Sequence, residues 1–132
     1  MKYFICALGR ASLGFPAGQT ERIIPVTREQ TIVREITEGE TFISIPALFR
    51  LPGIPAPHGL VLKIPGAVLP GRIILLTPKI DIDVEIPDEK IKKLPGSFAG
   101  VYSLVNGACF MDQGMILLLD SIKLAEKLLM EN

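Results

Sequence analysis

The chain has 132 residues, of which 48% are hydrophobic and 21% charged, and its 14 basic and 14 acidic residues cancel. A chain of this length can bury a core of its own, so we expect residues 1–132 to form a single domain. Balanced charge argues against nucleic acids and anionic membranes as partners, and apolar runs no longer than those at 4–8 and 115–119 argue against membrane insertion.

The first half of the chain reads as short strands joined by turns. Lys2–Leu8 is a predicted strand that ends at Gly9-Arg10, and small residues through Gly18 predict a loop. A second strand is predicted over 20–26, where Pro25 indicates an edge or a bulge. The elements expected next are a strand over 31–36 and a turn over 37–40. Apolar residues at 42, 43 and 45 then lead into a helical turn that begins at Pro46, and a strand is expected over 59–64.

The most regular pattern lies between residues 73 and 95. Residues 73–76 are continuously apolar, which is typical of a strand covered on both faces. Apolar and acidic residues then alternate, which predicts a strand with one apolar and one acidic face: Ile80, Ile82, Val84 and Ile86 against Asp81, Asp83 and Glu85. A helical turn over 87–92 and strands over 100–105, 108–111 and 115–119 follow. Asp120 or Ser121 can cap a final helix with this apolar side: Ile122, Ala125, Leu128 and Leu129.

The composition indicates a mostly β protein. Eleven prolines and twelve glycines spread along the chain suit short strands and turns and exclude a helix bundle. The two cysteines, Cys6 and Cys109, lie in apolar segments without CxxC spacing, so we expect small buried hydrophobic side chains. No signal-peptide pattern is visible at the N-terminus, and the expected localisation is therefore cytoplasmic.

The order of the motifs resembles that of the CheW domain, the adaptor module of bacterial chemotaxis. The family's opening pair of strands is similar to FICALGR and TERIIPV, and its P-x-x-D-L-R-x-x-L-G segment is similar to FISIPALFRLPG, in which Pro46, Arg50 and Gly53 fall in place. The second half of the family, which ends in a strand that runs into a D-x-x-K-L helix, resembles these segments: IILLTP, KIDIDVEI, PDEKIKKLP, FAGVYSL and GMILLLDSIKLAEKLL.

This resemblance implies a mostly β fold of two small SH3-like β-barrel subdomains packed together, with a short C-terminal helix and a hydrophobic groove between the barrels. It implies that the chain binds proteins, catalyses no reaction and holds neither a cofactor nor a metal ion. The partners that it predicts are the regulatory domain of a CheA-type histidine kinase and the cytoplasmic tip of a methyl-accepting chemoreceptor. The expected groove residues are Ile23 and Ile74, the latter at the glycine position of the family's V-G-x-x-V-D strand, with Phe49 and Phe110 as further candidates.

Two other interpretations stay open. The family's G-x-x-N-L-R-G segment has no counterpart here, which leaves room for a free-standing CheW-like β-barrel that binds a partner outside chemotaxis or associates with itself. A small hydrolase would need His58, the only histidine, near Cys6 or Cys109, but neither cysteine has a neighbouring base. The carboxylates on the strand over 80–86 would stand about 6.5–7 Å apart, too far to share a metal ion, and are expected to form a solvated face.

Overall fold

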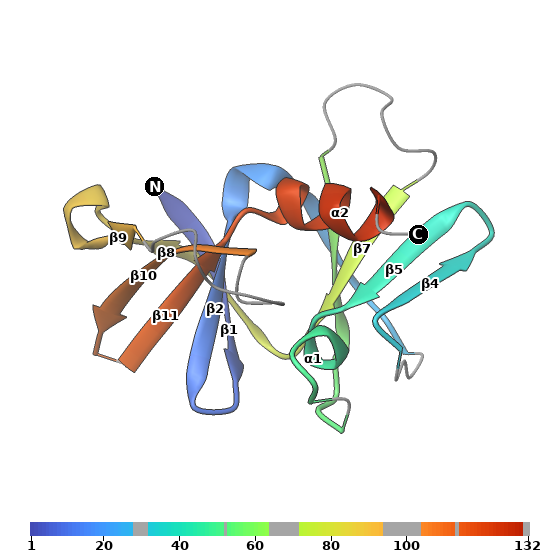
Figure 1. Ribbon diagram of the computed structural model, residues 1–132, viewed down its shortest axis with the longest axis horizontal. Helices are drawn as coiled ribbons and strands as arrows, with labels where there is room; N and C mark the ends of the chain where they lie inside the picture. The colour runs from blue at the N-terminus through green and yellow to red at the C-terminus, as the bar shows by residue number, and fades with distance from the viewer. Residues whose placement is uncertain (28–31, 52, 64–71, 94–103, 113, 131–132) are drawn as a thin grey trace.

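Two β-sheets make up most of the structure, a computed structural model that describes residues 1–27, 32–51, 53–63, 72–93, 104–112 and 114–130 (Figure 1). Within these ranges, six strands form sheet A in the order β8-β1-β2-β11-β10-β9, and five form sheet B in the order β3-β6-β7-β5-β4. The prediction of a mostly β fold is confirmed. No described pairing joins β8 to β9 or β3 to β4, so closure into SH3-like barrels stays a prediction.

Sheet A combines strands from both ends of the chain, whereas sheet B uses the middle. Sheet A contains β1 (Lys2–Leu8), β2 (Ala11–Pro16), β8 (Ile80–Glu85), β9 (Lys92–Lys93), β10 (Val105–Met111) and β11 (Gly114–Leu119). Sheet B contains β3 (Thr20–Pro25), β4 (Arg34–Thr37), β5 (Glu40–Ser44), β6 (His58–Leu62) and β7 (Arg72–Thr77). The helical elements are η1 (Ala17–Gln19), α1 (Ile45–Leu48), η2 (Asp88–Lys90) and α2 (Ser121–Met130). Residues 31, 64 and 100–103, which the sequence placed in strands, lie outside the described ranges.

Strand β2 occupies a segment where the sequence predicts a loop. A tight turn, in which Gly9 takes a φ of 66°, reverses the chain so that β2 pairs antiparallel with β1. β2 also pairs parallel with β11, which places it inside sheet A. Its loop-like composition has a packing reason, because a Cβ added at Gly14 would lie 2.7 Å from Cδ2 of Leu118. The prediction of a loop here is therefore wrong.

We expect Gly14→Ala to lower the free energy of unfolding by about 1–3 kcal/mol, because the new methyl group crowds Leu118, Ile5 and Ile116. Gly18→Ala is the matched control, since a Cβ at Gly18 would meet no atom within 4 Å. Urea unfolding of the two variants measures the difference. Equal stability of the two variants would show that sheet A can accommodate the methyl group.

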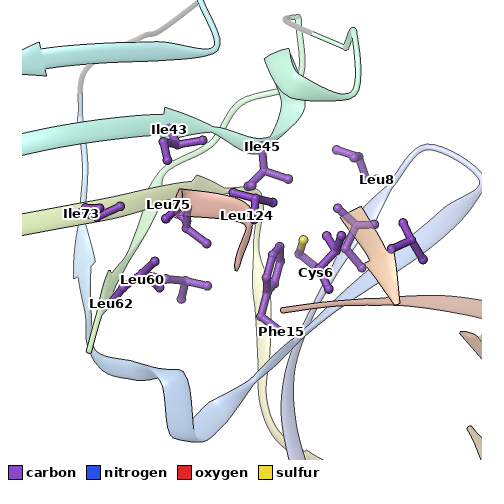
Figure 2. Packing of buried hydrophobic residues seen from close by; sticks show 14 residues of the cluster. Cys6, Leu8, Phe15, Ile43, Ile45, Leu60, Leu62, Ile73, Leu75 and Leu124 are labelled. Carbon is purple, nitrogen blue, oxygen red and sulfur yellow. The ribbon is translucent and has the colours of Figure 1, made fainter. Parts of the chain in front are cut away.

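Apolar side chains form three clusters, because the side chains of each strand alternate between the two faces of its sheet. The shared core lies between the sheets and contains residues of both; Figure 2 shows Cys6 and Phe15 of sheet A near Leu60, Leu62 and Leu75 of sheet B. The second cluster, on the other face of sheet A, contains Tyr3, Ile5, Ile86, Cys109, Ile116 and Leu118. The third cluster, on the other face of sheet B, contains Phe42, Val61, Ile74 and Leu76. Both cysteines are free and buried, as predicted.

A β-bulge interrupts the predicted alternation of strand β8. The pairing of β1 with β8 shifts register between Tyr3 and Ile5, so an extra residue lies on the β8 side. As a result, Ile80 packs against the shared core and Val84 against the second cluster, whereas Ile82 is 61% exposed. The prediction of one fully apolar face on this strand is therefore wrong.

The two α-helices begin at capping side chains. The hydroxyl of Ser44 accepts a hydrogen bond of 3.2 Å from the backbone N–H of Ala47 at the start of α1, which has a proline in its first turn as predicted. Oδ1 of Asp120 accepts one of 3.0 Å from the backbone N–H of Lys123, which confirms Asp120 as the cap of α2. In the described ranges, neither helix has the length and apolar character needed to cross a membrane.

Candidate protein-binding surface

The space between the sheets, where the family resemblance implies an open apolar groove, is filled by the shared core. Phe15 of sheet A is 1% exposed and Leu60 of sheet B is 0% exposed, and both belong to this core. Helix α2 adds Leu124, a residue that the predicted apolar side of the helix did not include. In the described part of the chain the expected groove is thus corrected to a packed interior, because large side chains from both sheets meet there.

Ile74 is a core residue of sheet B. Its strand, β7, lies between β6 and β5, and its side chain is 0% exposed in the third cluster. This burial agrees with the prediction that 73–76 is covered on both faces. It does not agree with an open groove lined by Ile74, so we remove this residue from the proposed contacts and assign it a packing role.

Ile23 and Phe49 lie at the rim of the shared core. Ile23, on the edge strand β3, pairs with Leu60, and Phe49 directly follows α1; both are half-buried and pack against the core. Among the described residues, these half-buried apolar side chains pack against the shared core: Phe4, Ile23, Leu48, Phe49, Ile54, Ile80, Leu104, Leu117 and Leu128. Contact of Ile23 or Phe49 with a partner stays a prediction, because each side chain already has apolar neighbours within the chain.

Phe110 is the expected site residue that the structure places at the surface. It lies on β10 and is 69% exposed, and its cross-strand partner on β11 is Met115, 38% exposed. Side chains that face each other across a strand pair share one face of the sheet, so these two form a continuous apolar pair. Leu51, 38% exposed, lies beside the β1–β2 turn, where a Cβ at Gly9 would be 3.8 Å from its Cδ1.

We call the cross-strand pair of Phe110 and Met115 the hairpin-end surface. In Figure 1 the tip of the β10–β11 hairpin lies at the lower left, the β1–β2 turn lies nearer the centre, and the segment after α1 lies further to the right. Exposed Arg10 and Arg50 lie in that turn and after α1, respectively. Sequence reasoning missed Met115, although a two-residue turn between Met111 and Gly114 would have placed it opposite Phe110.

The described residues do not bring a reactive thiol and a base together. Cys6 lies in the shared core, where burial raises the pKa of its thiol to about 12. Cys109 lies in the second cluster, and burial raises its pKa as well. His58 starts β6 in sheet B, where it pairs with Pro25 and Thr77. Thiols held in the protonated form are poor nucleophiles, so the hydrolase interpretation loses support.

We expect alkylation of Cys6 by iodoacetamide at pH 8 to be at least about 100-fold slower in the folded chain than in the chain unfolded by denaturant. The raised pKa leaves almost no thiolate at this pH, and the thiol is also buried. Peptide mass spectrometry of time points reports the rate at each cysteine. Rapid alkylation of Cys6 under native conditions would contradict this burial.

No protein-family model matches the sequence, and no curated protein matches it either. The structure, in contrast, is similar to the crystal structure of the scaffolding protein TtCheW from Thermoanaerobacter tengcongensis, with a TM-score of 0.66. The superposition covers 90% of this chain and 88% of that one, at 14% sequence identity. The chain has a CheW-like fold.

A CheW-like fold places the candidate surface on regular elements. Phe110 and Met115 lie on paired strands rather than on loops, so their positions are fixed by the hydrogen bonds of the β10–β11 ladder. No group of three or more His, Cys, Asp or Glu side chains in the described ranges could hold a metal ion. The features that a ligand could recognise here are exposed apolar side chains and strand edges, which suit protein partners.

Proposed function

We propose that the chain is a non-enzymatic adaptor that couples chemoreceptors to a CheA-type histidine kinase in a chemotaxis-type signalling pathway. The observation that carries the proposal is the CheW-like fold over nine tenths of the chain, shared with a protein described as a scaffold. The exposed Phe110–Met115 pair adds a surface of the kind that protein interfaces use, since aromatic residues and methionine are enriched there.

The hairpin-end surface is the proposed contact for the receptor tip. A helical hairpin presents apolar residues at i, i+3, i+4 and i+7 along one side, and such a stripe can cover an exposed aromatic–methionine pair. Arg10 lies in the turn before β2, the strand that pairs with β11, so it would border the contact and favour acidic residues beside that stripe. Phe110, as the most exposed aromatic residue of the described chain, would carry the largest share of the binding free energy.

An adaptor needs a second surface, and the edge of sheet B offers one. Ile36 lies on β4, the last strand of that sheet, and is 65% exposed. In Figure 1, β4 and the β10–β11 hairpin lie at opposite sides of the molecule, so two partners could bind at once. We assign the kinase regulatory domain to the Ile36 edge, because an edge strand with an apolar side chain can pack against a neighbouring β-domain.

Isothermal titration calorimetry with two ligands tests this assignment, using the receptor cytoplasmic fragment and the kinase regulatory domain encoded in the same genome. We expect both to bind, and we expect Ile36→Asp to weaken kinase binding at least about tenfold while leaving receptor binding unchanged. Absence of binding by either wild-type partner would overturn the adaptor role. Loss of both partners in Ile36→Asp would overturn the two-surface arrangement.

A second candidate function is a CheW-like module that associates with itself or binds a partner outside chemotaxis. The exposed Ile36 on an edge strand favours it, because unpaired strand edges template pairing with another chain. Sedimentation equilibrium of the isolated chain separates the two cases. A dimer that Ile36→Lys dissociates, together with no binding to receptor or kinase, would favour this second function over the first.

A further inference from the structure

Helix α2 crosses from sheet A to sheet B over the shared core. It starts directly after β11 of sheet A, and near its far end the carbonyl of Leu128 accepts a hydrogen bond of 2.7 Å from Nη1 of Arg34, on β4 of sheet B (Figure 1). Between these ends, Leu124 and Ala125 are 0% and 1% exposed within the shared core. The helix therefore covers one side of the shared core and is held by hydrogen bonds near both of its ends.

Gln19 fixes the first end of α2. It is the last residue of η1, which carries the chain from β2 in sheet A to β3 in sheet B. Its Oε1 accepts a hydrogen bond of 2.8 Å from the backbone N–H of Ser121, and its Nε2 donates one of 3.1 Å to Oδ1 of Asp120. Its backbone carbonyl accepts one of 2.9 Å from the N–H of Lys63, just after β6. A single residue thus joins the start of α2 to the junction of the two sheets.

Among the side chains that the structure describes, helix α2 is covered on one side only. It packs Leu124 and Ala125 against the shared core and leaves Lys123 and Glu126 exposed, whereas β7 is covered on both faces by buried apolar residues of the shared core and the third cluster. The hydroxyls of Ser121 and, beside Gln19, Thr20 are buried without a hydrogen-bond partner in the described structure. Opening of the helix would hydrate the Ser121 hydroxyl, which offsets part of the lost packing. Elements with few buried apolar contacts are those that open below the free energy of global unfolding.

We propose that α2 opens as a unit while both sheets stay folded, and that the uncovered part of the shared core binds an amphipathic helix of a partner protein. The kind of occupant follows from α2, which places Leu124 and Ala125 against the core while Lys123 and Glu126 are exposed. A competing helix would need apolar residues at the same i, i+1 and i+4 positions, with Leu128 as the last. This site is separate from the hairpin-end surface, so the inference stands independently of the proposed function.

Native-state hydrogen exchange of the full-length chain tests the opening. We expect the α2 amides to exchange at least about tenfold faster than those of β7, and Gln19→Ala to accelerate α2 roughly another tenfold without affecting β7. Glu126→Ala, on the exposed side of the helix, is the control and should change neither rate. Exchange of α2 and β7 at one common rate in all three proteins would overturn the proposal.

A synthetic peptide with the sequence of residues 120–130, added in excess to the full-length chain, tests helix binding. We expect it to accelerate exchange of the chain's own α2 amides, because it occupies the core while α2 is open. The same peptide with Leu124→Lys should have no such effect, since a lysine cannot replace a fully buried leucine without cost. Equal effects of the two peptides, or no effect of either, would overturn helix binding even where opening is observed.

Discussion

Phe110→Asp is expected to weaken binding of the receptor cytoplasmic fragment by about 2 kcal/mol or more, which is roughly 30-fold in Kd. The aspartate places a charge in the middle of the apolar pair that Phe110 forms with Met115. The stability of the chain should change by less than about 0.5 kcal/mol, because the side chain is 69% exposed. Isothermal titration calorimetry and urea unfolding of the same preparation measure both quantities.

Ile82→Asp provides the matched control for this experiment. Ile82 is 61% exposed on β8 of the same sheet, so the substitution introduces the same charge at a similar exposure outside the hairpin-end surface. We expect its receptor affinity to equal that of the wild type. If Phe110→Asp binds as tightly as Ile82→Asp, the receptor does not contact the hairpin-end surface, and that part of the proposal fails.

Ile74→Ala is expected to lower the free energy of unfolding by about 2–5 kcal/mol, because it leaves a cavity among Phe42, Val61 and Leu76. A loss of this size is a large fraction of the roughly 5–15 kcal/mol that stabilises a typical domain. The fraction that stays folded should bind receptor with unchanged affinity, since the side chain does not reach the surface. Urea unfolding gives the stability, and calorimetry corrected for the folded fraction gives the affinity.

Ile36→Ala removes the same atoms from a 65% exposed position in the same sheet and should cost less than about 0.5 kcal/mol. Comparing the unfolding free energies of Ile74→Ala and Ile36→Ala tests whether burial determines the loss of stability. A folded Ile74→Ala chain with wild-type stability and weakened receptor binding would contradict the core assignment and would restore Ile74 as a contact residue.

Local patterns in the sequence correctly predicted a mostly β fold and most of the described elements. The continuous apolar run at 73–76 indicated a strand covered on both faces, and β7 lies inside sheet B with apolar clusters on each side. The acidic residue before the last helix was predicted as a possible cap, and Asp120 fulfils that role. These features depend on neighbours in sequence, which is the information that periodicity and capping rules contain.

Features that depend on distant segments could not be predicted in this way. Strand β2 has a glycine at position 14 because a Cβ there would collide with Leu118, which lies more than 100 residues later in the chain. The bulge on β8 arises from its pairing with β1, and it turned Ile82 from a predicted core position to the surface. A periodic pattern in one strand does not report such changes in the register of a pair.

The candidate site could be predicted only in part, because exposure at the surface also depends on distant segments of the chain. Phe110 was named from its apolar character alone, and the structure shows it exposed, whereas Ile74 was named from a family position and is buried. The open groove was expected from the resemblance, but its closure depends on side chains of both sheets and on Leu124 of α2. Whether a groove is open or filled depends on how the whole molecule packs, and it cannot be predicted from the sequence of one strand.

Co-sedimentation with receptor vesicles tests the adaptor role most directly. Vesicles carrying the receptor cytoplasmic fragment are mixed with the kinase regulatory domain, with and without this chain, and the pellet is analysed for the kinase domain. The account predicts that the kinase domain pellets with the wild-type chain, and that it stays in the supernatant with Phe110→Asp, with Ile36→Asp or without the chain. A kinase domain that stays in the supernatant in the presence of the folded wild-type chain would contradict the account.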